Sequence, residues 1–452
     1  YKYYYDGLGI YDRIEIRNKY VITGRKGSGK TLIAYYYCAM KQKLNNIGIY
    51  EVESLKDVTI EAINKFKEQL SADNSILMWR WVLLICYAKW LLQDQCLDHD
   101  EEYIKCSNII NEIIPDIKSI YKIISTEVKY GLNIAGHQLG YENSVKEQSI
   151  IDKFESILFS FERSLINVAS QSQMEVRLFM DDLDEKYINN DQYLDSVRDI
   201  LSAAEVVNNL FIERGVNSKF IILLRSDIVK KLRGVNIGKI KRDCTVEIDW
   251  TTKISFDTPV LKMLISKIRN SVDSMRRMSD HTVFNAIFSE FTNGEQTYKY
   301  ILNRTMLRPR DLISFISIII ENNKNSDKIT QQMIYDAERQ YGEYLKEEVY
   351  NELFGTYTQK YIDSLFKLLK LNRQSDFSFP RIRAVYDEYK SNLEIGDLNE
   401  ALEVLFEYSI IGNIVDGNSS PIYSFRYRDL DAPFAQNEQI TIHPGLRREI
   451  NR

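Results

Sequence analysis

The segment Gly24–Thr31 combines the residue types and the spacing that phosphate binding requires. It matches the pattern G-x-x-x-x-G-K-[ST] at every fixed position. Glycines let successive backbone N–H groups turn inward around an anion, and a helix that follows adds the positive end of its dipole. We expect Lys30 to contact the β- and γ-phosphates of ATP and Thr31 to bind Mg²⁺. The residues expected to hold the nucleotide are Gly24, Arg25, Lys26, Gly27, Ser28, Gly29, Lys30 and Thr31.

A cluster of carboxylates follows the apolar run Val176–Met180. We expect Asp181 to reach Mg²⁺ and a second carboxylate to orient or deprotonate the attacking water. Asp182 is the first candidate for that base and Glu185 the second. With Asp184, four carboxylates lie within five residues, and their mutual repulsion favours a nearby cation. The alternative is a solvated acidic loop.

Five short apolar runs predict the strands that position these residues. The first ends at the phosphate loop and the third ends at Asp181. Helical patterns separate the runs, so the sequence predicts an α/β fold with a parallel sheet covered on both faces. Sites in such sheets lie at the carboxyl ends of the strands. The predicted strands are Tyr20–Thr23, Ile47–Val52, Val176–Met180, Lys219–Leu224 and Thr245–Ile248.

The rest of the chain is mostly helical in pattern. The most apolar stretch, Ile76–Leu92, contains Arg80 and Lys89; it is too short and too charged for a membrane span and predicts a buried helix. Helices run from Pro259 to about residue 353, and helices followed by short β-like runs then suggest a winged helix. The expected domains are a P-loop ATPase core at 1–253 with a helical insertion at about 54–173, a helical lid at 254–353 and a winged-helix-like domain at 354–452.

The composition is that of a globular protein of 452 residues with a net charge of −5. This charge gives no general attraction to nucleic acid or to an anionic membrane. The five cysteines form no CxxC pair and the four histidines are isolated, which disfavours a zinc site and fits a reducing, cytoplasmic location. Because residue 1 is Tyr, we expect a longer natural chain, from which an effector domain is missing.

The order of these motifs resembles that of bacterial ATPases related to origin-recognition and STAND-type AAA+ proteins. The resemblance covers nearly the whole chain, although the long helical insertion departs from a minimal AAA+ core. Many proteins of this kind belong to antiphage defence systems, so the resemblance implies such a role. The segments that carry it are the phosphate loop, Asp181–Glu185, Leu223–Asp227, Glu247–Trp250, Arg308–Ile313 and Ile440–Leu446.

The same resemblance suggests roles for three arginines. Arg225 follows the fourth strand, at the sensor-1 position; it would contact phosphate, pair with Asp182 or pair with Asp227. Arg310 would be a sensor-2 residue that reaches the nucleotide from the lid, or else form a structural ion pair. Arg242 would be a finger inserted into a neighbour's site, or else part of a basic surface loop with Lys239 and Lys241.

Three functions are compatible with these features. The first is an ATPase that switches conformation or assembly with nucleotide, as a homo-oligomer or with a separate effector protein and without a membrane partner. The second is a DNA-binding loader, although residues 351–452 carry twelve Lys and Arg against fifteen Asp and Glu, and DNA-binding wings are normally basic. The third is a nucleotide-bound scaffold with little hydrolysis. Residues that would form a local basic patch for DNA are Arg381, Arg383, Arg426 and Arg428.

Overall fold

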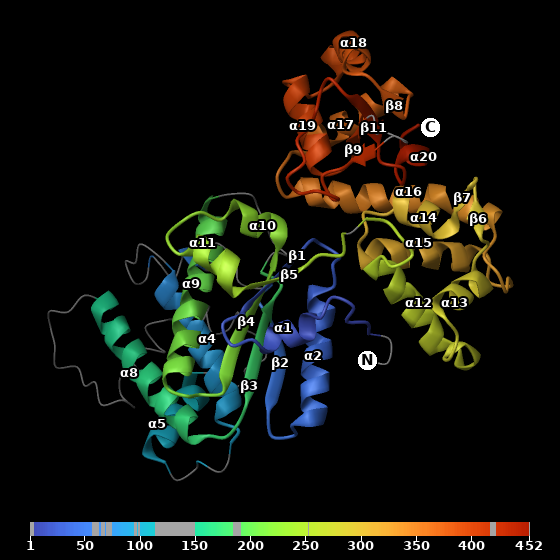
Figure 1. The fold of residues 1–452 in the computed structure, drawn as a ribbon. Coiled ribbons are helices and arrows are strands. Elements are labelled where there is room, and N and C mark those ends of the chain that lie inside the picture. The colour runs from blue at the N-terminus through green and yellow to red at the C-terminus, as the bar shows by residue number, and fades with distance from the viewer. Residues whose placement is uncertain are drawn as a thin grey trace. The chain divides into compact units, whose positions relative to one another are not determined.

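The computed structural model describes residues 4–56, 63–64, 68, 75–94, 97, 100–113, 150–183, 191–251, 253–415 and 422–451 (Figure 1). The chain forms two compact units. The first spans Gly9–Ile248, and the second spans Asp249–Arg452 together with the described residues before Gly9. Each unit has a hydrophobic core of its own.

The first unit is built on a five-stranded parallel sheet in the order β2-β3-β4-β1-β5. All five predicted strands are present, and each boundary differs from the prediction by two residues at most. Because these strands are parallel and β4 lies between β1 and β3, the carboxyl ends of all three lie side by side at one edge. The strands are β1 Val21–Gly24, β2 Ile49–Ser54, β3 Val176–Asp181, β4 Ser218–Arg225 and β5 Thr245–Ile248.

Helices cover both faces of this sheet, as the alternating pattern predicts. Helices α1 and α2 lie on one side, and α4 and α9 on the other (Figure 1). Helix α9 ends next to Gly215, whose φ of +69° is the left-handed conformation expected after a helix. The helices are α1 Ile10–Glu15, α2 Lys30–Leu44, α4 Ile76–Leu91, α5 Glu101–Ile113, α8 Ile150–Gln171, α9 Asp191–Glu213, α10 Ser226–Lys231 and α11 Ile237–Lys239.

Helix α4 is the buried helix that the sequence predicts. It packs between α8 and α9 and is apolar on almost every side, because it has little solvent-facing surface. The two charges that interrupt its sequence are neutralised locally: Arg80 lies 2.7 Å from Glu162, and Lys89 lies 3.2 Å from Glu53. In the described part of the chain, no helix combines the length and the apolarity that crossing a bilayer requires.

The second unit is helical, with a small antiparallel sheet near the C-terminus. One hydrophobic cluster runs from Val260 to Ile450, so the expected lid and winged-helix regions share a core. The sheet order is β10-β9-β11-β8. The helices are α12 Pro259–Ser271, α13 Asp280–Ile287, α14 Thr297–Asn303, α15 Pro309–Asn322, α16 Gln331–Phe354, α17 Gln359–Asn372, α18 Phe379–Tyr389, α19 Leu398–Glu407 and α20 Arg447–Ile450. The strands of the C-terminal sheet are β8 Asp376–Phe377, β9 Ile411–Val415, β10 Ile422–Ser424 and β11 Gln439–Ile442.

Two details of the second unit differ from the sequence prediction. The β-like run predicted from the sequence at Ile422–Tyr427 forms a strand only as far as Ser424, and Phe425 and Tyr427 beyond it are buried. A two-stranded hairpin, β6 Phe291–Thr292 with β7 Glu295–Gln296, interrupts the expected run of helices. Its turn, Asn293-Gly294, has positive φ at both residues. This dipeptide is the strongest short hairpin signal, so the sequence did contain the information.

Candidate functional site

The loop between β1 and α2 has a backbone that only glycines accommodate. A Cβ atom on Gly24 would lie 2.4 Å from Ser28 Oγ and 3.2 Å from the Ile248 carbonyl oxygen, so a side chain at this position would displace the Ser28 hydroxyl and crowd β5. Gly27 and Gly29 have φ values of +80° and +94°, a conformation that other residues rarely adopt. The loop is closed by a hydrogen bond of 3.1 Å from the backbone N–H of Ser28 to the carbonyl of Arg25. Arg25 and Lys26 lie on this loop and are half-buried.

Lys30 is the first residue of α2 and points back to the loop. Its side chain is largely buried, and Nζ donates a hydrogen bond of 3.2 Å to the carbonyl oxygen of Gly24. The ammonium is thereby held above the loop whose backbone N–H groups would receive phosphate oxygens. A cation in this position complements an anion in the loop.

Thr31 and Asp181 meet at the carboxyl edge of the sheet. The Thr31 hydroxyl donates a hydrogen bond of 2.6 Å to Asp181 Oδ2, and the backbone N–H of Asp182 donates one of 2.8 Å to Oδ1. Burial raises the pKa of Asp181, and the hydrogen bond from Thr31 acts in the opposite direction. A hydroxyl and a buried carboxylate in contact are oxygen ligands of the kind that Mg²⁺ takes together with phosphates. The residues expected to hold Mg²⁺ therefore fit that ion.

Asp182 is held in an unusual conformation beside this pair. Its φ is +62°, which is uncommon for a residue other than glycine. The Ser54 hydroxyl at the end of β2 donates a hydrogen bond of 2.7 Å to Asp182 Oδ2. This contact fixes the carboxylate next to Asp181. Glu185, the second candidate base, lies outside the described residues.

Ser54 is a residue that the sequence reasoning missed. In the sheet register it stands opposite Asp181, because β2 and β3 are neighbours. The sequence did show that Ser54 is a polar residue just after a predicted strand. The other site residues were expected at this same edge of the sheet. Without the strand order, nothing in the sequence pairs Ser54 with Asp182.

Arg225 ends β4 directly beside the start of the phosphate loop. In the register of β1 with β4 it stands opposite Gly24. Its guanidinium binds the Asp227 carboxylate through two contacts, Nε–Oδ1 of 3.0 Å and Nη2–Oδ2 of 2.7 Å. Of the alternatives raised by the sequence, the structure therefore contains the pair with Asp227.

Arg242 lies on the surface of the first unit. It belongs to the π-helical turn Ile240–Cys244 that leads into β5, and its side chain is 76% exposed. Nε lies 2.9 Å from Asp243 Oδ1. The same segment contains Lys239, which pairs with Glu205 at 3.0 Å. Arg242 is exposed enough to contact a neighbouring molecule if its pair with Asp243 opens, and its role as a finger stays a prediction.

Arg310 and Arg308, two residues apart on the second unit, have different surroundings. Arg308 is buried, and it contacts Asp311 at 2.7 Å and Glu352 at 2.5 Å. Arg310 lies in the first turn of α15; its side chain is 47% exposed, 3.1 Å from Glu348. Arg308 is therefore a structural residue that ties α15 to α16. Arg310 retains the exposure that a nucleotide contact needs, and that role stays a prediction.

The four arginines considered for DNA binding divide into two pairs. Arg426 binds Glu407 at 2.7 Å, and Arg428 donates a hydrogen bond of 3.0 Å to Asn303, so both are used in internal contacts. Arg381 and Arg383 lie on α18 and are exposed.

These features define the class of the first unit as an α/β unit with a P-loop-like fold. Comparisons with known proteins match either a part of the second unit or nearly the whole chain. Residues 259–349 match the FunZ-associated C-terminal helical domain. The chain is 23% identical over 464 residues to the putative transposon gamma-delta 80.3 kDa protein of Escherichia coli (strain K12), covering 95% of this chain and 62% of that protein. The chain thus spans less than two thirds of this relative.

One solved structure shows a distant likeness. It is the structure of the Aeropyrum pernix Orc1 protein in complex with DNA, with 11% sequence identity and a TM-score of 0.35. The likeness extends over 98% of this chain and 88% of that chain. At this level of similarity it assigns neither an activity nor a ligand to the present protein.

Proposed function

We propose that the chain is a Mg²⁺-dependent ATPase that changes conformation or assembly with its nucleotide state. The observation that supports this most directly is the contact between Thr31 and Asp181, which brings the end of the phosphate loop onto a buried carboxylate. A phosphate-binding loop, a hydroxyl and a carboxylate are the groups that hold the phosphates and Mg²⁺ in phosphoryl transfer by P-loop enzymes.

Each residue would have a separate task in this reaction. The backbone N–H groups of Gly27–Lys30 and the Lys30 ammonium would bind the β- and γ-phosphates and hold the terminal phosphate in place. Thr31 and Asp181 would hold Mg²⁺, which neutralises the charge that develops on the phosphate oxygens. Asp182, oriented by Ser54, would accept a proton from the attacking water, and Glu185 is the alternative base.

The proposed cellular role rests on the resemblance described from the sequence. It is that of a regulatory or assembly subunit in the cytoplasm, part of an antiphage defence system, acting as a homo-oligomer or with a separate effector. Arg310 in the lid and Arg242 on the surface are the residues that would connect nucleotide state to lid position and to a neighbouring subunit. Sedimentation of the chain with Mg²⁺ and a non-hydrolysable ATP analogue tests this role. A larger species with nucleotide is expected, and an unchanged size would count against assembly.

The test of nucleotide binding uses Lys30→Ala. The ammonium supplies a charge-assisted contact worth about 1.5–3 kcal/mol, so ATP affinity should fall about tenfold or more. Lys43→Ala is the matched control, because Lys43 is an exposed lysine near the end of the same helix. Isothermal titration with Mg²⁺ and ATP measures both. If Lys30→Ala bound ATP as tightly as the control, the proposed function would be wrong.

A second candidate function, DNA loading, has one observation in its favour. Arg381 and Arg383 are exposed on the same helix of the C-terminal part, as a DNA-contacting helix would require. The test is binding to duplex DNA at low salt, with Arg381→Ala and Arg383→Ala combined in one variant. Failure of the unmodified chain to bind DNA would remove this candidate. The third possibility, a nucleotide-bound scaffold with little hydrolysis, is tested by a single-turnover assay of ATP cleavage. Cleavage of ATP by the chain would exclude it.

A further inference from the structure

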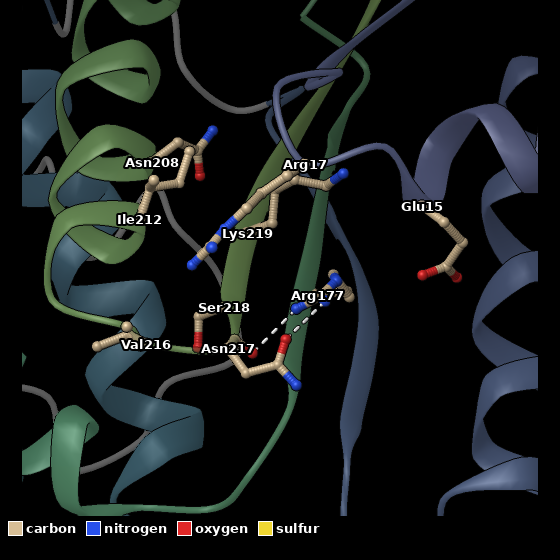
Figure 2. A pocket seen from close by; sticks show the side chains of 10 residues that line it. Glu15, Arg17, Arg177, Asn208, Ile212, Val216, Asn217, Ser218 and Lys219 are labelled. Atoms are coloured by element: carbon tan, nitrogen blue, oxygen red, sulfur yellow. Dashed lines mark hydrogen bonds between the residues drawn. The ribbon is translucent and has the colours of Figure 1, made fainter.

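A cavity of about 410 Å³ lies at the edge of the sheet where β3 and β4 begin, opposite to the phosphate loop. Figure 2 shows the side chains that line it. The cavity is built around the first residues of β3 and β4, including Arg177 and Lys219, whereas Asp181 and Arg225 stand at the other ends of these strands. Its volume falls in the range of small-molecule sites. The cavity belongs entirely to the first unit and shares no residue with the candidate nucleotide site.

Positive charge predominates around this cavity. Arg17, Arg177 and Lys219 line it, and Glu15 is the acidic residue of the lining. Glu15 already pairs with Lys41 at 2.9 Å. Glu175, which is not a lining residue, pairs with Arg177 at 2.8 Å and with Lys41 at 3.4 Å. The lining and these two neighbouring residues together contain four basic side chains and two carboxylates, and an anion in the cavity would offset the excess of positive charge.

The two arginines differ in what they offer to a ligand. Arg177 is fixed by Asn217: Nη1 donates to the backbone carbonyl and Nη2 to the side-chain oxygen, each at 2.9 Å (Figure 2). Arg17 makes no hydrogen bond or ion pair with any residue that the structure describes. Its guanidinium is therefore available for a bidentate contact with an oxyanion, while Arg177 contributes charge at a fixed place.

Lys219 is a buried cation at the same cavity. Nζ donates hydrogen bonds to the carbonyl oxygens of Ile14 and, at 3.1 Å, Ile16, and the residue is only 6% exposed. Burial lowers its pKa to about 7; Arg177 and Lys41 lower it further, while Glu15 and Glu175 act in the opposite direction. An anion beside Lys219 would stabilise its charged form.

The cavity also has an apolar wall. Ile212 from α9 and Val216 from the loop that follows line it on the side of the helix. We propose that this cavity binds a small organic oxyanion, with its carboxylate or phosphate group on the Arg17 guanidinium, in the positive field of Arg177 and Lys219, and its apolar body against Ile212 and Val216. The site is independent of nucleotide binding at the phosphate loop.

Nuclear magnetic resonance of the full chain with labelled isoleucine methyl groups tests this site. The Ile212 methyl reports on the cavity, and the Ile33 methyl, in the first turns of α2, reports on the phosphate loop. Loss of a signal in Ile212→Val or Ile33→Val assigns each. The probes are benzoate, phenyl phosphate and neutral benzyl alcohol, titrated with saturating Mg²⁺ and a non-hydrolysable ATP analogue and repeated in Lys30→Ala. The first two probes decide whether the cavity prefers a carboxylate or a phosphate.

The expected result is a saturable shift of the Ile212 signal with at least one anionic probe, with a Kd below about 1 mM. Arg17→Gln should weaken this binding about tenfold or more. Arg214→Gln removes the same charge from the exposed end of α9, outside the lining, and should change affinity less than about twofold. Binding in Lys30→Ala should be unaffected, which separates this site from the proposed ATPase activity.

Proton linkage gives a second readout. Benzoate stays ionised from about pH 6 to about pH 8.5, whereas Lys219 loses its proton in this range, so benzoate affinity should fall about tenfold across it. The proposal is wrong if the Ile212 signal does not shift, if benzyl alcohol shifts it as strongly as the anions, or if Arg17→Gln and Arg214→Gln behave alike.

Discussion

The Thr31 hydroxyl and Asp181 Oδ2 lie 2.6 Å apart, although 150 positions separate the two residues in the sequence. The contact exists because β3 ends and α2 begins at the same edge of the sheet, so that the last residue of the strand meets the second residue of the helix. It is the place where a metal ion would join the phosphates to the protein.

Asp181→Asn tests that arrangement. The variant keeps the shape of the side chain but loses its charge, so Mg²⁺-dependent ATP cleavage should fall about 100-fold or more. ATP binding with the metal chelated should change little, because the loop and Lys30 are untouched. Single-turnover assays and titrations measure the two quantities. Asp195→Asn, an exposed change on α9, is the control. Equal cleavage by the two variants would exclude Asp181 as a metal ligand.

Asp182→Asn tests whether Asp182, the carboxylate next to Asp181, is the general base. Asparagine tolerates the positive φ of residue 182, so the backbone should be retained. We expect ATP binding to persist and turnover to fall about 10- to 100-fold, as for loss of a general base. If turnover survives in this variant and Glu185→Gln abolishes it, the base is Glu185.

Ser54 should act on the same step by orienting Asp182. Ser54→Ala removes one hydrogen bond worth about 0.5–1.5 kcal/mol, so turnover should fall about two- to tenfold with unchanged ATP affinity. Ser54→Thr retains the hydroxyl and should preserve turnover. A structural role alone would instead alter stability in both variants, and that result would contradict the assignment.

The fold of the first unit follows from the sequence because its strands are short, continuous apolar runs. A parallel strand that is buried on both faces appears in the sequence as a continuous apolar run. This run can be recognised without knowing which strands lie beside it. The positions of the phosphate loop after β1 and of Asp181 at the end of β3 were predictable for a related reason: each is marked by residues next to each other in the chain.

The remaining contacts depend on which strands become neighbours. Ser54 meets Asp182 because β2 lies beside β3, and Arg225 stands opposite Gly24 because β4 lies beside β1. Local pattern does not set strand order, so neither relationship was accessible from the sequence. The partner of Arg225 was also open, because the sequence allowed phosphate, Asp182 or Asp227 and does not fix the direction of the side chain.

Arg308 and Arg310 form a matched pair for separating stability from function. Arg308→Ala leaves Asp311 and Glu352 without their buried cation and should lower the free energy of unfolding by about 3–5 kcal/mol. Arg310→Ala removes a half-exposed pair and should cost at most about 1 kcal/mol. Urea unfolding followed by circular dichroism measures both. ATP turnover that falls in the stable Arg310→Ala variant would support the lid contact, and unchanged turnover would remove it.

Lys219 should make the stability of the first unit depend on pH. Its pKa is about 7 in the folded chain, whereas in the unfolded chain it is near the ordinary lysine value of about 10.4. Between these values the unfolded chain holds a proton that the folded chain lacks, so the free energy of unfolding rises with pH, by about 1.4 kcal/mol per unit at most. Below about pH 7 both states are protonated and the slope vanishes.

Comparison of the parent chain with Lys219→Met isolates this contribution. The difference in unfolding free energy, parent minus variant, should increase from about pH 7 to about pH 9.5, because only the parent carries the group. Urea unfolding followed by tryptophan fluorescence reports mainly on the first unit, where Trp79, Trp81 and Trp90 lie in or against the core. Lys43→Met, an exposed change, should show no such slope. A flat difference for Lys219→Met would mean that the ammonium stays charged in the folded chain, and the pH dependence expected for benzoate binding would then be lost as well.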